Sequence, residues 1–360
     1  IRLSRDRVDR LGYFSEVNIE TAEVPGSMDQ VDLTLNVVEK PTGNLMLGAG
    51  FSSAEKLSLT ASIKQDNIFG SGNYLGVEFN TSKYNRTLVV STVDPYFTVD
   101  GISRSIDLYY RTTRPLSSQG SDYKLVTPGA AIRFGVPFSE FDTVYFGIGA
   151  ESTEIRGDPG ALPNSYFRYR EEFGATSVAI PLTLGWTRDD RDSALVPTRG
   201  RFQRLNAEWS VAGDSRYLRA NYQFQQYVPL GRDFTFAFNT ELGWGKGMQG
   251  RPFPIFKNFY SGGLGTVRGF EQGSLGPVDA TGASIGGPKR VNLNGEFYVP
   301  FPGVGNDRTL RLFAYVDAGN VFLRVGDIDL SELRGAVGFG IRYRSPAGPI
   351  RGGPGFQPGR

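Results

Sequence analysis

The feature that most constrains the fold is a two-residue alternation of apolar and polar side chains over segments of about ten residues. In residues 204–211 the apolar set is Leu205, Ala207, Trp209 and Val211, and the polar set is Arg204, Asn206, Glu208 and Ser210. The same pattern recurs in residues 217–228, 233–244 and 291–299. A long apolar and aromatic face opposite a polar face is typical of a strand that crosses a bilayer as part of a barrel. These segments therefore predict membrane-spanning strands.

Less regular segments of similar length raise the predicted total to about fourteen strands. They lie near residues 43–53, 56–66, 72–81, 85–94, 103–112, 122–135, 141–155, 176–188, 309–322 and 334–344. No run of about 18 apolar residues is present, which excludes a transmembrane helix. A soluble β-sandwich is the alternative, but its strands are shorter and its outer face is polar. We predict an all-β fold, a transmembrane antiparallel β-barrel.

Composition excludes most enzyme classes. The chain has no His and no Cys, so a Ser–His–Asp triad, a thiolate nucleophile and the usual zinc ligands are all missing. Asp189, Asp190 and Asp192 could suggest calcium, but Arg191 interrupts them, and a solvated turn is the commoner explanation. With 39 basic and 37 acidic residues and no basic block, nothing indicates a nucleic-acid partner. We expect no catalysis, no metal and no cofactor.

The first 40 residues differ from the rest. A helix is predicted over residues 4–11 and strands over residues 13–21 and 30–39, which is half of a small α+β module. Residues 41–43, Pro-Thr-Gly, mark the boundary. The chain opens without a signal peptide, so we expect an internal part of a longer precursor.

A long Gly- and Pro-rich stretch between Trp244 and Val291 contains a compact turn that presents one arginine, Arg268. The ordinary interpretation is a mobile extracellular loop. By strand alternation, however, Glu296 and Asp317 both point into the barrel, where an arginine on an in-folded loop can pair with them bidentately. The alternative is that they are two of many solvated luminal charges.

Several motifs, in order along the chain, resemble the BamA family, the central component of the outer-membrane β-barrel assembly machinery. They are Val267-Arg268-Gly269-Phe270, residues 94–97 (DPYF), residues 192–200 (DSALVPTRG), residues 312–320 (LFAYVDAGN) and residues 342–350 (RYRSPAGPI). Together they extend over nearly the whole chain. The resemblance implies a sixteen-stranded barrel preceded by periplasmic polypeptide-transport-associated (POTRA) domains.

The resemblance also assigns domains and site residues. Residues 1–40 are expected to be the C-terminal part of the last POTRA domain, residues 43–350 the barrel with an inward loop over about 245–288, and residues 351–360 an atypical or truncated tail. Val267, Arg268, Gly269 and Phe270 would lie at the loop tip, with Glu296 and Asp317 pinning Arg268 inside the barrel. The first strand would form one side of a lateral seam; its expected seam residues are Gly43, Leu45, Leu47, Gly48 and Gly50.

The tail departs from the family pattern. Residues 351–360 are rich in Gly and Pro and do not alternate, so we predict that they form no membrane strand and leave the first strand without its partner. Such an open barrel would close poorly.

The function implied by the resemblance is assembly and insertion of β-barrel proteins into the bacterial outer membrane through the seam, with the N-terminal part in the periplasm. The implied partners are unfolded outer-membrane protein clients, accessory lipoproteins of the assembly complex, periplasmic chaperones and outer-membrane lipid. A translocation or secretion pore of the same superfamily shares the arginine motif and stays open as an alternative. A passive porin, in which the loop merely narrows the pore, is the other.

Overall fold

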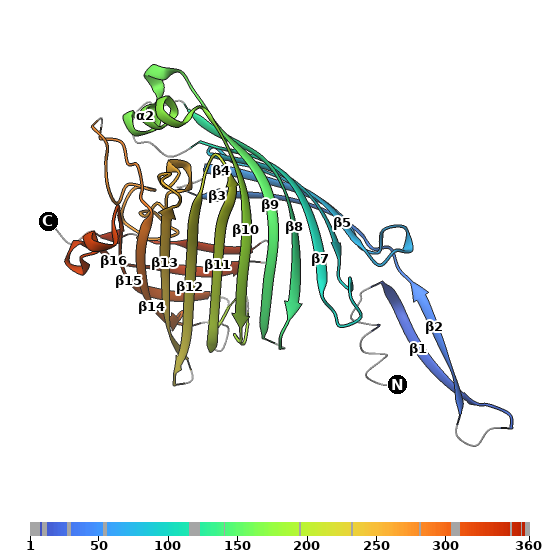
Figure 1. The fold of residues 1–360 in the computed structure, drawn as a ribbon. Helices are drawn as coiled ribbons and strands as arrows, with labels where there is room; N and C mark the ends of the chain where they lie inside the picture. Colours follow the sequence, from blue (N-terminus) through green and yellow to red (C-terminus); the bar gives the residue numbers. More distant parts are fainter. Residues whose placement is uncertain are drawn as a thin grey trace.

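The computed structural model contains a small two-stranded sheet and a large curved sheet (Figure 1). It describes residue 8 and residues 13–26, 30–52, 56–114, 123–139, 141–193, 196–231, 233–280, 282–303, 310–345, 348–353 and 355–356. The small sheet is an antiparallel hairpin of β1 (Phe14–Glu23) and β2 (Val31–Glu39). It lies apart from the large sheet, near the ends of the first strands of that sheet (Figure 1).

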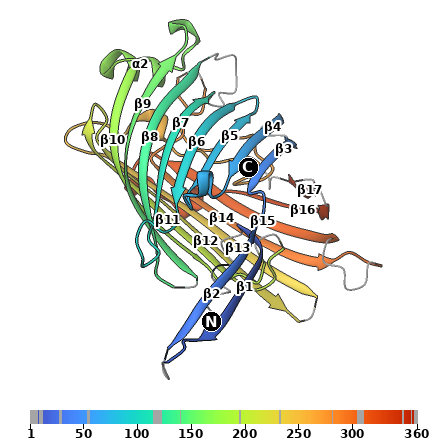
Figure 2. The same ribbon diagram turned by 90° about the vertical axis from the view of Figure 1, so that its right-hand side faces the viewer.

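The large sheet is 16-stranded and antiparallel, and its neighbours follow chain order from β3 to β17, with β18 also paired to β16. Its strands are β3 (Gly43–Ser52), β4 (Lys56–Gln65), β5 (Tyr74–Thr81), β6 (Asn85–Asp94), β7 (Ser103–Thr113), β8 (Lys124–Pro137), β9 (Asp142–Arg156), β10 (Thr176–Asp189), β11 (Gly200–Gly213), β12 (Tyr217–Leu230), β13 (Phe234–Gly247), β14 (Lys289–Pro300), β15 (Leu310–Phe322), β16 (Arg334–Ser345), β17 (Gly348–Gly352) and β18 (Gly355–Phe356). The sheet curls round until β3 and the last strands lie on the same side of the molecule (Figure 2).

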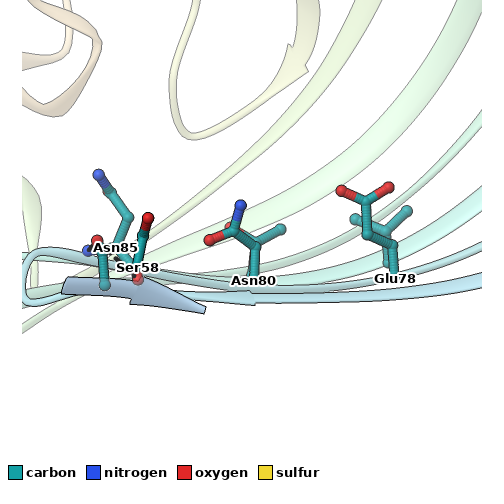
Figure 3. A pocket seen from close by; sticks show the side chains of 7 residues that line it. Ser58, Glu78, Asn80 and Asn85 are labelled. Carbon is teal, nitrogen blue, oxygen red and sulfur yellow. Dashed lines mark hydrogen bonds between the residues drawn. The ribbon is translucent and has the colours of Figure 1, made fainter. Parts of the chain in front are cut away.

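The two faces of the curved sheet carry different side chains. On β3 the outward residues are apolar and largely exposed, as Leu45 (67%), Leu47 (74%) and Phe51 (78%) show. On the inner face, Ser58, Glu78, Asn80 and Asn85 project together from β4, β5 and the start of β6 into a polar hollow (Figure 3). A wall that is apolar outside and polar inside is what a barrel in lipid requires.

The fourteen strands expected from alternation all occur, with ends shifted by a few residues. Both strands expected before the barrel are present as β1 and β2. The helix expected over residues 4–11 lies outside the described residues, apart from Val8, which is helical. In the described ranges, no helix has the length and apolar character needed to cross a membrane.

Part of the chain after Ile350 pairs with β16, which was not expected from its Gly- and Pro-rich sequence. Arg351 and Gly352 complete β17, opposite Arg342 and Ile341, and β18 pairs with Val337 and Gly338 of β16. A ladder needs only extended backbone N–H and C=O groups, which glycine supplies without any alternation of side chains. Both strands are nevertheless far shorter than the 9–11 residues that span a bilayer.

A helix between β9 and β10 was not anticipated. Helix α2 (Asn164–Phe173) lies at one end of the barrel and buries Tyr166, whose ring centroid is 4.8 Å from that of Tyr123. Tyr169 packs edge to face on Phe256, with 5.8 Å between the ring centroids. The helix thus covers the segment that follows β13.

The opposed faces give a direct test on one strand. We expect Val77→Lys, near the middle of β5 and facing outward, to destabilise the folded barrel by about 2–4 kcal/mol, because an ammonium would be placed in lipid. Asn80→Lys is the matched control, since Asn80 faces the polar hollow beside Glu78 (Figure 3). Guanidinium unfolding in lipid vesicles measures both. Equal loss of stability in the two variants would contradict the assignment of faces.

Candidate functional site

The candidate site is built by residues 248–288, which connect β13 to β14 and fold back against the inner wall. The connection contains a single turn of 3-10 helix, η3 (Ile255–Lys257), and is cross-linked to itself by isolated bridges. Phe259 bridges Gly287, and Ser261 bridges Leu275. Residues 248–288 are therefore a folded segment with internal backbone pairing. We call this segment the inner loop.

The tip of the inner loop is a tight turn. Gly263 N–H donates to the Val267 carbonyl (2.9 Å), and Thr266 N–H donates to the Gly263 carbonyl (3.1 Å). The Thr266 hydroxyl accepts from Gly262 N–H at 2.8 Å. Gly262 and Gly263 have φ of +107° and +96°, a region that favours glycine. The turn presents Arg268 toward the wall.

Arg268 contacts both carboxylates expected from the sequence. Its backbone N–H and its Nε donate to Asp317 Oδ2, at 3.0 and 2.5 Å, and its Nη2 donates to Asp317 Oδ1. Its Nη1 donates to Glu296 Oε1 at 2.5 Å. The Asp317 side chain is fully buried and that of Arg268 is 7% exposed. The guanidinium therefore forms a bidentate pair with one carboxylate and a single bond to the other, and we call this arrangement the arginine lock.

Neighbouring donors also hold the two carboxylates. Asn294 Nδ2 donates to Asp317 Oδ1 at 2.9 Å and to the Thr266 carbonyl at 2.6 Å, so it ties the wall to the turn. The Tyr298 hydroxyl donates to Glu296 Oε2. The Arg268 guanidinium carbon lies 3.7 Å from the ring centroid of Tyr315, a cation–π contact.

These supporting residues were not predicted. Asn294 and Tyr298 lie on the same inward-facing set of β14 as Glu296, and Tyr315 lies on that of Asp317 in β15. The alternation that selected the two carboxylates would also have selected them. They are neutral, whereas the partners expected for an arginine are carboxylates.

Val267 is anchored next to the lock. It is fully buried and packs with Leu275 and Ala336, with Phe270 against the edge of the cluster. A Cβ on Gly319 would lie 2.8 Å from Val267 Cγ2 and 2.4 Å from Asn292 Oδ1. Gly319 therefore leaves the space that lets the turn approach β15. Gly269, with φ of +87°, completes the four-residue motif.

The expected seam residues lie elsewhere. Gly43, Leu45, Leu47, Gly48 and Gly50 are all on β3, at the opposite end of the sheet order from the lock strands. Strand β3 pairs with β4 along its full length, and no other ladder to β3 is present in the part of the chain that the structure describes. The structure thus brings the lock residues together and leaves the β3 residues on an edge.

The acidic cluster considered for calcium is held by the protein itself. Asp189 pairs with Arg191, and Asp190 pairs with Arg201. Asp192 accepts from Thr198 N–H at 2.8 Å and also from its hydroxyl. Over the described ranges, no group of three or more acidic residues is arranged to hold a metal ion. This cluster builds a turn between β10 and β11.

Together, the fold and the lock define a class: a transmembrane β-barrel whose inner loop is bound to the wall through one arginine. The family model for the Omp85 superfamily domain matches residues 67–356. The chain belongs to the Omp85 superfamily, and it is a bacterial outer-membrane protein.

Two relatives are named outer membrane protein assembly factor BamA. That of Neisseria meningitidis serogroup B is 35% identical, with 98% of this chain and 49% of the relative covered. That of Nitratidesulfovibrio vulgaris is 29% identical, with 99% of this chain and 44% of the relative covered. The chain spans about half the length of these relatives.

Solved structures show the same fold. BamA from Haemophilus ducreyi lacking POTRA domains 1–3 superposes with a TM-score of 0.90 at 24% identity, covering 99% of this chain and 74% of that one. CdiB from Acinetobacter baumannii superposes with a TM-score of 0.56 at 14% identity, covering 94% and 61%.

We expect Arg268→Ala to destabilise the docked loop by about 3–5 kcal/mol, because it leaves the buried Asp317 carboxylate without its cation. Arg268→Lys should recover less than half of this, since an ammonium cannot form the two-pronged contact. Limited proteolysis within residues 248–288 measures loop release. Arg251→Ala, on an exposed residue of the same loop, is the control. Equal protection of the loop in Arg268→Ala and the unaltered protein would contradict the lock.

The Asp192 turn provides a prediction about pH. Burial acts to raise the pKa of Asp192, but hydrogen bonds from Thr198 and from Arg199 N–H outweigh it and hold this pKa below its ordinary value. A depressed folded-state pKa stabilises the protein above the unfolded value of about 3.9, and the contribution is lost as pH falls through the folded value.

We therefore expect Thr198→Val, which removes the hydroxyl donor, to lower the unfolding midpoint at pH 7 and to have little effect at a pH below the folded-state pKa of Asp192. Thr198→Ser keeps the donor and serves as the control. Guanidinium midpoints at the two pH values provide the measurement. A Thr198→Val effect of the same size at both would show that the carboxylate contributes nothing through this bond.

Proposed function

We propose that this chain is the barrel portion of a factor that assembles and inserts β-barrel proteins into the bacterial outer membrane. The observation that carries the proposal is its 35% identity, over 98% of its length, to a relative named an outer membrane protein assembly factor. The work it would do is non-enzymatic: no bond is made or broken, and a client strand is supplied with backbone hydrogen-bond partners while it enters lipid.

The free edge of β3 is the proposed place of action. An edge strand presents unpaired N–H and C=O groups that can template an incoming strand. Gly48 and Gly50 fall on the inward face of β3, opposite Thr60 and Ser58 of β4, where they contribute no bulky side chain to hold the edge. We propose that β3 and the short strands β17 and β18 form the two sides of a lateral seam through which clients enter.

The arginine lock would hold the inner loop against β14 and β15, close to β16 and therefore to the far side of this seam. A loop fixed there supports the last strands while the seam opens. The proposal predicts that the lock is needed for assembly rather than for barrel formation itself.

The proposed domain assignment and the proposed partners follow from the same reasoning. Residues 1–40, with the β1–β2 hairpin, would be the C-terminal part of the last POTRA domain, located in the periplasm; residues 43–350 the barrel; and residues 351–360 an atypical end. The proposed partners are unfolded outer-membrane protein clients, periplasmic chaperones that deliver them, accessory lipoproteins and outer-membrane lipid.

A translocation pore of the same superfamily is the second candidate. The fold match to CdiB, at a TM-score of 0.56, favours it only at the level of architecture. A passive porin would use the inner loop to narrow the lumen and would not depend on Arg268.

Growth complementation distinguishes these candidates. The full-length parent gene is expressed in a strain depleted of its own assembly factor, with Arg268 intact or changed to Ala. We expect the intact gene to restore growth and the variant to restore it weakly or not at all, with Arg251→Ala behaving like the intact gene. If the intact gene is expressed and its product inserts normally but does not restore growth, the translocation pore or the passive porin would be favoured. Full rescue by Arg268→Ala would separate the lock from assembly.

A further inference from the structure

A second cation of the inner loop lies against a different part of the wall. Lys257, at the end of η3, places its Nζ 2.8 Å from Glu208 Oε1 on β11 and 2.5 Å from Glu151 Oε1 on β9. The exposed fractions of the three side chains are 17% for Lys257, 20% for Glu208 and 9% for Glu151. The Glu208 contact is also a hydrogen bond, whereas that to Glu151 is an ion pair without hydrogen-bond alignment. One ammonium is thus shared by two largely buried carboxylates.

The wall prepares both carboxylates for this cation. The Tyr217 hydroxyl donates to Glu208 Oε1, and the Tyr109 hydroxyl donates to Glu151 Oε2 at 3.1 Å. Lys257 Nζ also lies 5.3 Å from the ring centroid of Tyr217. Because tyrosines of β12 and β7 fix the acceptors, the site is oriented before the loop arrives, and binding needs little further ordering.

The backbone of the same residue is held as well. Arg219 Nε donates to the Lys257 carbonyl at 3.1 Å, and its guanidinium carbon lies 4.2 Å from the ring centroid of Phe259. Arg290 contacts the same ring, at 5.2 Å from its guanidinium carbon to the ring centroid. The Lys257 side chain is thus held by β9 and β11, and its carbonyl and the Phe259 ring are held by β12 and β14.

The ion-pair partners of Lys257 lie on β9 and β11, and those of Arg268 lie on β14 and β15. In the sheet order, β12 and β13 separate the two groups. We propose that Lys257 is a second anchor of the inner loop, which fixes its first part to the β9–β12 wall and thereby positions the turn that carries Arg268. The inference concerns the resting position of the loop and holds whether or not the chain is an assembly factor.

The positioning follows from chain connectivity. Once Lys257 is bound, the segment up to Arg268 is tethered at one end, which raises the effective concentration of the arginine at its carboxylates. The loop then connects the β9–β11 part of the wall to the β14–β15 part. Losing either anchor should release its own part of the loop first and leave the other part bound.

Hydrogen exchange of the full-length protein in lipid nanodiscs tests this. In Lys257→Met, which keeps the aliphatic stem, we expect amides of residues 255–263 to exchange at least about tenfold faster through local opening. Amides of residues 266–270 and of β9–β13 should change much less. Arg268→Ala should give the reverse pattern within the loop. Lys246→Met, on an exposed lysine at the end of β13, is the control and should alter neither segment.

Two results would overturn the proposal: unchanged exchange over residues 255–263 in Lys257→Met, or release of residues 255–270 as one unit in either variant. If Lys257→Met also loses protection in the strands, Glu208→Gln decides the matter, because it preserves shape and removes one charge. That variant should accelerate residues 255–263 much more than residues 266–270, and no acceleration of residues 255–263 would count against the anchor. Lys257→Arg, which keeps the charge, should restore most of the protection. None of these readouts depends on growth complementation, so they stand or fall separately from the proposed function.

Discussion

The structure depends on one constraint, which is that a backbone crossing lipid must pair every N–H and C=O group with another backbone group. Strands β3 to β16 meet it by pairing in chain order, each with the next. Among the described residues, the ladder is incomplete at the two ends of the sheet, where β3 pairs with β4 and β16 is met by two short strands. The part of the wall that is least satisfied is also the part where another strand would be accepted, so the defect and the proposed activity have the same physical origin.

The lumen obeys a second rule, that buried charge must be paired. Asp317 is fully buried and would be costly on its own, and Arg268 neutralises it while Asn294 supplies a further donor. Lys257 meets the same need for Glu208 and Glu151. At these two sites the wall supplies the acids and the inner loop supplies the bases. This division allows each partner to fold on its own element and to be neutralised only when the loop docks, which makes docking specific in position as well as favourable.

Much of this was accessible from the sequence, because period-two alternation reports both the strands and the direction in which each side chain points. For this reason the sequence alone predicts that Glu296 and Asp317 face the lumen, where Arg268 can reach them. The role of Lys257 could not be predicted in the same way. The residue lies in a short 3-10 turn within a loop, where no strand periodicity gives the direction of a side chain, and its partners are distant in sequence. Helix α2 was not predicted because it is short and is stabilised by packing of Tyr166 and Tyr169, a tertiary effect. The pairing of β17 and β18 was missed because glycine-rich strands leave no side-chain pattern.

The lock also joins parts of the chain that are made at different times. Arg268 precedes Glu296 by 28 positions and Asp317 by 49, and both carboxylates lie on strands that follow the loop. Contacts of this separation carry a cost in loop-closure entropy and need both strands in place. An occupied lock therefore reports that β14 and β15 have already found their register in the barrel.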